Sequence, residues 1–235
     1  MSDRCVLESP PFVLGGDFRP VPSVFRSFNQ KLAVMPEASF TAQNDSLQHG
    51  VAGNYDPRDL IRIFDALFGE TENTRLIWGG DEPIYLPADS EVPFNRVIFA
   101  HGYFASALHE IAHWCIAGSE RRRLTDFGYW YAPDGRSAAQ QQAFEKVEVK
   151  PQALEWILSK ACGKPFRVSV DNLNGEQSDP EPFKRAVCRQ VQAYCREGIP
   201  ACAQMLRDAL ATFYGTAPGL EECHFPPGEL GLDDE

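Results

Sequence analysis

With 235 residues and 43% hydrophobic side chains, the chain is long enough for one folded domain with appendages. No apolar run approaches the ~20 residues of a membrane span and no secretory signal opens the chain, so we expect a cytoplasmic protein with no membrane partner. The formal net charge of −11 lies mostly at the C-terminal end, where residues 221–235 hold six acidic and no Lys or Arg residues. Residues 57–220 carry a charge of only −3. A nearly neutral body of this kind argues against general nucleic-acid binding, which needs a basic surface.

Residues 1–56 are rich in Pro and Gly and lack a long periodic segment, which predicts an N-terminal extension with short ordered pieces at most. Asp56 and Pro57 then have the residue types of a helix N-cap and first helical position. Apolar residues at helical spacing follow as far as Gly69. We therefore expect the folded domain to span residues 57–218, followed by an acidic C-terminal tail at 219–235.

Short strands are predicted at residues 75–78, 84–86 and 96–100. The last of these leads into a helix at 103–117, which Gly118 ends. Further along, the pattern predicts a strand at 126–131, a long helix at 137–162 interrupted by Pro151, a strand at 166–170, and helices at 183–197 and 201–214. Because strands and helices do not alternate regularly, the fold class is α+β. We expect one compact domain with a mixed, short-stranded sheet packed against helices.

The seven cysteines are odd in number and include no CxxC pair, which argues against a disulfide framework or a zinc knuckle. Cys188, Cys195 and Cys202 recur every seven residues, but Gly198 interrupts the helix that would align them. Core packing is therefore favoured over metal binding for these three. The triple arginine at 121–123 indicates either a solvated helix end or a docking patch for an acidic partner.

The segment His109-Glu110-Ile111-Ala112-His113 matches the HExxH pattern. On a helix, residues four apart lie on one face, so two imidazoles can reach one cation. Apolar neighbours make this helix largely buried, which favours the neutral imidazole that a metal requires. We predict His109 and His113 as metal ligands and Glu110 as a catalytic residue.

A third ligand must come from another part of the chain. Within the helix at 137–162, an apolar stripe runs through Phe144, Val147, Pro151, Leu154 and Leu158. At about 100° per residue, Glu148 lies at the border of this stripe and Glu145 faces away from it. Glu148 is therefore the predicted third ligand. Glu155 has a phase still closer to the stripe, but that phase is counted across Pro151.

Three kinds of site fit these residues. Zinc with an open position would make a hydrolase in which Glu110 acts as the general base. Iron(II) held by two His and one carboxylate would leave positions for dioxygen and substrate. A structural site would recruit a fourth protein ligand. His101, eight residues before His109, is either such an additional group or an ordinary partly buried histidine. HExxH alone favours a zinc peptidase.

The surrounding sequence changes this preference, because residues 72–158 strongly resemble the bacterial elongation factor P hydroxylase family. A weaker likeness runs through residues 171–173 and 198–200, and the whole match covers about 57–215. The strings that carry the resemblance are NTRLI (73–77), DEPIYLPAD (81–89), EVP (91–93), FAHG (99–102), HEIAHWCIAG (109–118), DFGYWY (126–131) and VEVKPQAL (147–154). They are much more specific than HExxH. Residues 1–56 and the acidic tail lie outside the family pattern.

The resemblance implies hydroxylation of the lysine of elongation factor P that carries a β-lysyl extension. It implies Fe(II) as cofactor, dioxygen as co-substrate, and His109, His113 and Glu148 as the metal ligands. It also implies a fold similar to that of a bacterial metal-dependent ribonuclease. A zinc-dependent hydrolase remains the alternative.

The substrate would present a long cationic side chain. Three tyrosines are candidates to line its channel, and three carboxylates are candidates to pair with its charge; ordinary core packing is an equal alternative for each. They are Tyr85, Tyr129 and Tyr131, and Asp81, Glu82 and Asp126.

Overall fold

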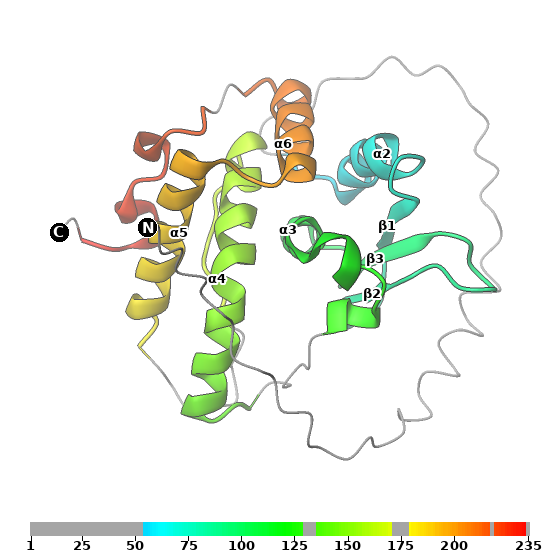
Figure 1. The fold of residues 1–235 in the computed structure, drawn as a ribbon. Coiled ribbons are helices and arrows are strands. Elements are labelled where there is room, and N and C mark those ends of the chain that lie inside the picture. The colour runs from blue at the N-terminus through cyan, green and yellow to red at the C-terminus, as the bar shows by residue number, and fades with distance from the viewer. Residues whose placement is uncertain (1–53, 129–134, 171–178, 217–218, 234–235) are drawn as a thin grey trace, which may run out of the picture. The chain divides into compact units, whose positions relative to one another are not determined.

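The structure, a computed structural model, describes residues 54–128, 135–170, 179–216 and 219–233. Residues 46–235 form one compact unit, whereas the predicted extension before residue 54 lies outside the described ranges. A small sheet and a set of helices make up this unit (Figure 1), so the predicted α+β class is confirmed. Its helices and strands are α2 (Pro57–Phe68), β1 (Thr74–Trp78), β2 (Ile84–Leu86), β3 (Asn95–Phe99), α3 (Phe104–Arg121), α4 (Ala138–Ala161), α5 (Glu181–Glu197) and α6 (Ala201–Tyr214).

Helix α2 begins where the sequence predicts. The Asp56 side chain accepts a hydrogen bond from the Arg58 backbone N–H at 2.9 Å, and Pro57 occupies the first turn. Leu60, Phe64 and Phe68 are buried along one face. This face packs on β1 and on α6, which fixes the first helix against the sheet.

The three strands form a mixed sheet in the order β1-β3-β2. β3 pairs in parallel with β1 and antiparallel with β2. Because β3 is central, four of its five side chains are buried. One of them is Arg96, whose guanidinium meets the Asp89 carboxylate at 2.6 Å and the Pro87 carbonyl at 3.0 Å. The central strand ends directly before the turn that leads into α3.

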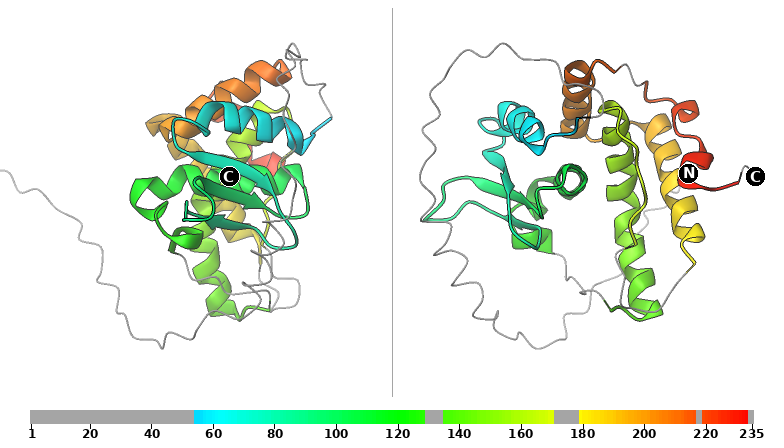
Figure 2. Two further views of the ribbon diagram at one scale, coloured as in Figure 1. Left: turned by 90° about the vertical axis from the view of Figure 1, so that its right-hand side faces the viewer. Right: turned by 180° about the vertical axis from the view of Figure 1, so that it is seen from behind.

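Helix α4 lies between two hydrophobic clusters. Leu154 and Leu158 belong to the cluster that α2, the sheet, α3 and α6 also form. Trp156 and Ile157 belong to a second cluster with α5 and the C-terminal segment. α3 packs on the sheet and on α4, and α5 packs on α4, an arrangement that can be followed in Figures 1 and 2. Residues 151–159 of α4 are therefore buried on every side.

Two predicted strands are wrong. Residues 125–128 form a 3₁₀ helix, in which Asp126 has φ +50°, a conformation that a β-strand does not allow. Residues 129–131 lie outside the described residues. Residues 166–170 pair with no strand among those described and instead run antiparallel to α4. The Gln152 side chain exchanges two hydrogen bonds with the Ser169 backbone, at 2.7 and 3.0 Å, and Phe166 stacks on Trp156.

The C-terminal acidic segment packs against the helices. Phe225, Leu230 and Leu232 are at most 6% exposed and join the second cluster. The segment holds two short 3₁₀ helices, Glu222–His224 and Pro227–Leu230. Within the described residues, no helix is long and apolar enough to cross a membrane.

Candidate metal centre

A tight turn connects β3 to α3. His101 and Gly102 both have positive φ, +54° and +67°. At Gly102 a Cβ atom would lie 1.9 Å from the Trp78 ring, so glycine is needed there both for its conformation and for its size. This turn sets the direction of α3 and so the place of the two histidines that lie on its second and third turns.

Helix α3 presents its apolar face to the core and its histidines to α4. Leu108, Ile111 and Ala112 are fully buried, and the histidine side chains are 20% (His109) and 16% (His113) exposed. The predicted end at Gly118 is confirmed: this residue has φ +72° and a non-helical conformation, and one further helical turn follows it.

Helix α4 supplies the predicted third side chain. A capping box between Ser137 and Gln140 begins this helix, and it continues through Pro151. Glu148 is 1% exposed although it is a carboxylate, whereas Val147, a member of the predicted apolar stripe, is 48% exposed. Glu148 is thus part of the buried face itself, and Val147 is not.

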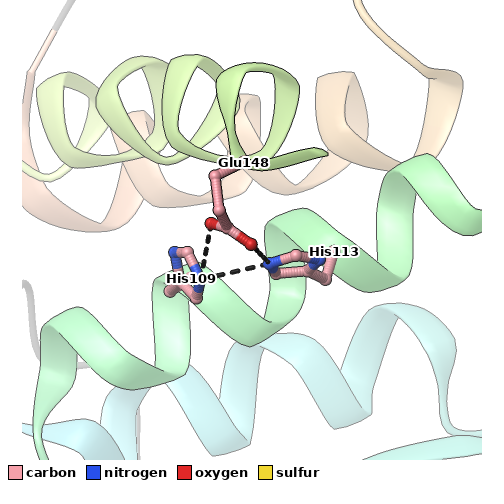
Figure 3. Close-up of side chains that lie close together, drawn as sticks. All are labelled: His109, His113 and Glu148. Carbon is pink, nitrogen blue, oxygen red and sulfur yellow. Dashed lines mark hydrogen bonds and ion pairs between the residues drawn. The ribbon is translucent and has the colours of Figure 1, made fainter. Parts of the chain in front are cut away.

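The structure brings His109, His113 and Glu148 together (Figure 3). The two Nε2 atoms are 3.1 Å apart, and they lie 3.4 Å (His109) and 3.2 Å (His113) from the two Glu148 oxygens. Three donor atoms, one from each residue, lie within 4.8 Å of one another. Two imidazole nitrogens and a carboxylate that face one point form a donor set that suits a divalent transition metal.

Glu155, also on α4, contacts His109 on the side of the imidazole ring that faces away from the donor group. Its Oε2 lies 2.9 Å from His109 Nδ1. A carboxylate at this nitrogen fixes the tautomer with hydrogen on Nδ1 and leaves the Nε2 lone pair free for a metal ion, as in carboxylate–histidine–metal triads. Gln152 Nε2 lies 3.5 Å from Glu148 Oε2, and the Ser169 backbone holds the same amide in place. Both supporting residues follow Glu148 on the same face of α4.

The buried carboxylates of the site favour a positive charge between the histidines. Burial by itself lowers the pKa of His109, but the charges of Glu148 and Glu155 and the hydrogen bond that His109 donates to Glu155 raise it to about 10. Burial by itself raises the pKa of Glu148, but His113 and His109 lower it to about 2. A buried carboxylate stays ionised only against a positive partner. A divalent cation bound by the two Nε2 atoms supplies that charge in place of a proton.

Glu110, the predicted catalytic residue, is next to the histidines but is not part of the donor set. Burial raises the pKa of Glu110, the two histidine charges oppose this, and Glu148 and Asp126 add to it. Burial also raises the pKa of Asp126, against the charge of His113. Neither carboxylate makes a hydrogen bond or ion pair with any residue that the structure describes. The two carboxylates thus lie within electrostatic range of His113, without a cationic partner among the described residues other than the histidines.

The other residues that the sequence suggests for the site are not part of the donor group. The His101 side chain is 50% exposed, with Nδ1 3.9 Å from Asp81, which is 99% exposed. Tyr85 is 1% exposed, and its hydroxyl donates to the Arg122 carbonyl at 2.7 Å, so it is a core residue and does not line a channel. Glu82 is exposed. Tyr129 and Tyr131 lie outside the described residues.

The triple arginine and the heptad-spaced cysteines can also be placed. Arg122 is 14% exposed, so the solvated helix end is a wrong interpretation for this residue, although Arg123 is 74% exposed. The thiols of Cys188, Cys195 and Cys202 are free. Within the part of the chain that the structure describes, one other group, formed by Glu221, Cys223 and His224, has donor atoms within the same distance, but Glu221 and Cys223 are exposed.

Comparison with known proteins agrees with the resemblance seen in the sequence. A family model described as elongation factor P hydroxylase matches residues 63–225. A curated relative from Haemophilus influenzae, named elongation factor P lysine hydroxylase, is 58% identical over 167 residues, which cover 71% of this chain and 94% of the relative. Neither comparison supports a zinc hydrolase. The chain belongs to the elongation factor P hydroxylase family.

Proposed function

We propose that the protein hydroxylates the β-lysyl-modified lysine of elongation factor P at an Fe(II) centre that uses dioxygen. The family match and the name of the Haemophilus influenzae relative support hydroxylation of elongation factor P. The single observation that carries the chemistry is the convergence of two imidazoles and one buried carboxylate on one point. This is the ligand set of non-haem iron oxygenases.

His109, His113 and Glu148 would hold the metal ion. When bound, Fe(II) supplies the activation of dioxygen that C–H hydroxylation needs. A structural zinc site would recruit a fourth protein ligand, often Cys, and the donor group at His109 includes no cysteine. Glu155 would keep the Nε2 lone pair of His109 directed at the ion, and Gln152 would hold Glu148 in place.

Glu110 and Asp126 would bind the substrate. A β-lysyl-lysine side chain is long and carries ammonium groups, and an unpaired, partly buried carboxylate gains most from a cationic partner. Because Glu110 and Asp126 both lie within electrostatic range of His113, an ammonium held there would keep the neighbouring carbons of the side chain close to the proposed metal. Glu110 is therefore a catalytic residue through contact with substrate rather than as a general base.

A mass measurement tests the function. Purified protein loaded with Fe(II) is incubated in air with β-lysylated elongation factor P. The mass of the peptide that carries the modified lysine is then measured by mass spectrometry. We expect a gain of one oxygen atom, and none with unmodified elongation factor P or with the His113→Ala variant. Glu145→Gln, which changes a carboxylate on α4, the helix that carries Glu148, should leave the reaction intact. No gain with iron content verified would refute the proposal.

A second experiment separates the hydroxylase from the zinc-hydrolase alternative. In a hydrolase, Glu110→Gln abolishes turnover because the general base is lost. In the proposed enzyme, Glu110→Gln and Asp126→Asn raise the KM for the cationic substrate more than they lower kcat, while Glu82→Gln, an exposed control, changes neither. A loss of kcat alone in Glu110→Gln would favour the hydrolase.

The remaining expectations from the resemblance belong to the same proposal. We propose the cytoplasm as the place of action, where elongation factor P functions in translation. We also propose the likeness to a metal-dependent ribonuclease fold, and a domain that begins at residue 57 and extends past the predicted limit at 218, because Phe225, Leu230 and Leu232 pack in the second cluster. Nucleic acid is not an expected partner, since residues 57–220 carry a charge of only −3.

A further inference from the structure

Three residues meet where the end of α3 contacts the beginning of α6. The Arg122 guanidinium donates from Nη2 to Cys202 Sγ at 3.6 Å. Cys202 Sγ also lies 3.7 Å from the backbone carbonyl oxygen of Cys115, so the two cysteines are in contact. Cys115 is on α3, two residues after His113, and Cys202 is the second residue of α6.

The surroundings of Cys202 are electropositive. Arg122 is held in place from three sides: its guanidinium carbon lies 3.7 Å from the centre of the Trp114 ring, its Nε donates to the Trp114 carbonyl at 3.0 Å, and its Nη1 pairs with Glu72 at 3.2 Å. The first turn of α6 adds the positive end of a helix dipole. Cationic neighbours and helix N-termini are the features that stabilise thiolates in reactive cysteines.

The charges at this place agree with the geometry. The contact with Cys115 and the Arg122 guanidinium outweigh burial and lower the pKa of the Cys202 thiol. Glu72 opposes Arg122 from the loop before β1, and Tyr194 faces Cys115 from α5 with a pKa that burial raises to about 12. Among the described residues that face the Cys202 thiol, Arg122 is the cationic one.

A hollow of about 390 Å³ leads to the same guanidinium. Its lining includes Glu72, Ser119, Arg122 and Arg123. Cys202 is only partly buried, whereas Cys115 is 4% exposed. A small oxidant therefore reaches Cys202 before Cys115.

We propose that Cys202 is an oxidation site, at which a hydroperoxide converts the thiolate to a sulfenic acid that Cys115 resolves as a disulfide between α6 and α3. The thiolate sulfur attacks one oxygen of hydrogen peroxide, the O–O bond breaks, and the leaving hydroxide becomes water with the proton that the Cys202 thiol released to solvent. The Cys115 sulfur then attacks Cys202 Sγ, the S–O bond breaks, and the hydroxyl leaves with the Cys115 proton as water. Two thiols thus give two electrons to one hydrogen peroxide, and a thiol reductant reverses the bond.

The proposal does not depend on the hydroxylase function, and Cys223 provides an internal control. Cys223 is exposed, but its sulfur lies 3.8 Å from a Glu221 carboxylate oxygen rather than beside a cation. The protein is treated with hydrogen peroxide, and then with an alkylating agent, and its peptides are mapped by mass spectrometry without reduction. A repeat with Zn²⁺-loaded protein excludes oxidants produced by iron.

We expect a Cys115–Cys202 disulfide, removed by dithiothreitol, to form before Cys223 is oxidised. In Cys115→Ser, a sulfenic acid at Cys202 should react with dimedone. Without peroxide, iodoacetamide should alkylate Cys202 about tenfold faster than Cys223 at pH 7, because an ordinary thiol is only a few per cent ionised there. Arg122→Met should remove that advantage and Arg123→Met should keep it, with thermal unfolding to verify folding. Equal reactivity of Cys202 and Cys223, or oxidation of Cys202 without bonding to Cys115, would overturn the proposal.

Discussion

Removal of the Glu155 carboxylate should weaken metal binding without removing a ligand. Glu155 is 11% exposed and lies 2.9 Å from His109 Nδ1. A hydrogen bond to a charged group contributes about 1.5–3 kcal/mol, and each 1.4 kcal/mol is about a factor of ten in affinity. Glu155→Ala should therefore bind a divalent metal about 10–100-fold more weakly, the range typical of such supporting carboxylates. Glu155→Gln keeps an acceptor oxygen but loses the charge. Its affinity for the metal should therefore lie between that of the wild type and that of Glu155→Ala.

The assay is competition for Zn²⁺ or Co²⁺ against a coloured chelator, with thermal unfolding to show that each variant folds. Glu145→Gln is the matched control, because this residue lies on the same helix and bonds to Gln141 instead of a histidine. Glu148→Gln, which changes a proposed ligand, should lose more affinity than Glu155→Ala. Wild-type affinity in Glu155→Ala would refute the reasoning, because the tautomer of His109 would then not depend on this contact.

Three further predictions concern stability. Saturation with metal at about 100 times Kd should raise the free energy of unfolding by about 2.7 kcal/mol, and a chelator should reverse the shift in Tm; an unchanged Tm would argue against binding to the folded state. Gly102→Ala should lower the free energy of unfolding by about 1–3 kcal/mol, measured by chemical denaturation, because φ +67° is strained for alanine even if the exposed Trp78 ring moves aside. Gly80→Ala is the control, because a Cβ atom there would have no neighbouring atom within 4 Å. Phe225→Ala should cost about 3 kcal/mol, since this ring is 2% exposed and meets Trp156 edge-on at 5.4 Å; a near-zero cost would mean that the acidic segment does not contribute to the fold.

The helices could be predicted from local signals because each begins or ends at a residue with a specific backbone role. Asp56 caps α2, and Gly118 breaks α3 with a positive φ. The strand predicted at 166–170 failed for a different reason. Phe166 is buried, Val168 and Val170 are partly buried, and the residues between them are exposed, as in a strand, but the Ser169 backbone bonds to the side-chain amide of Gln152. A sequence pattern does not show whether an extended segment pairs with a backbone or with a glutamine.

Part of the site could be predicted and part could not. HExxH places two histidines on one helical face by geometry alone, and the structure confirms this proximity. The apolar stripe predicts Glu148 at its border, and the stripe residues Phe144, Pro151, Leu154 and Leu158 are buried as expected. Val147 alone among them is exposed, because the buried face of α4 also includes the polar side chains of Gln141, Glu148 and Gln152. Glu155 was set aside because Pro151 could have kinked the helix, but α4 continues through it, so the phase counted across the proline was correct.

The burial of α4 explains why the site needs more than the HExxH helix. The histidines on α3 can reach one cation, but nothing on α3 fixes the position of a carboxylate opposite them. α4 packs against α3, α5 and α6, and both hydrophobic clusters include its side chains. A helix held on several sides cannot rotate without opening two clusters, so Glu148 and Glu155 keep their positions relative to His109. Cavity-forming changes in the second cluster, such as Ile157→Ala, should therefore weaken metal binding although they touch no ligand, whereas equally destabilising changes in α2, such as Leu60→Ala, should do so less.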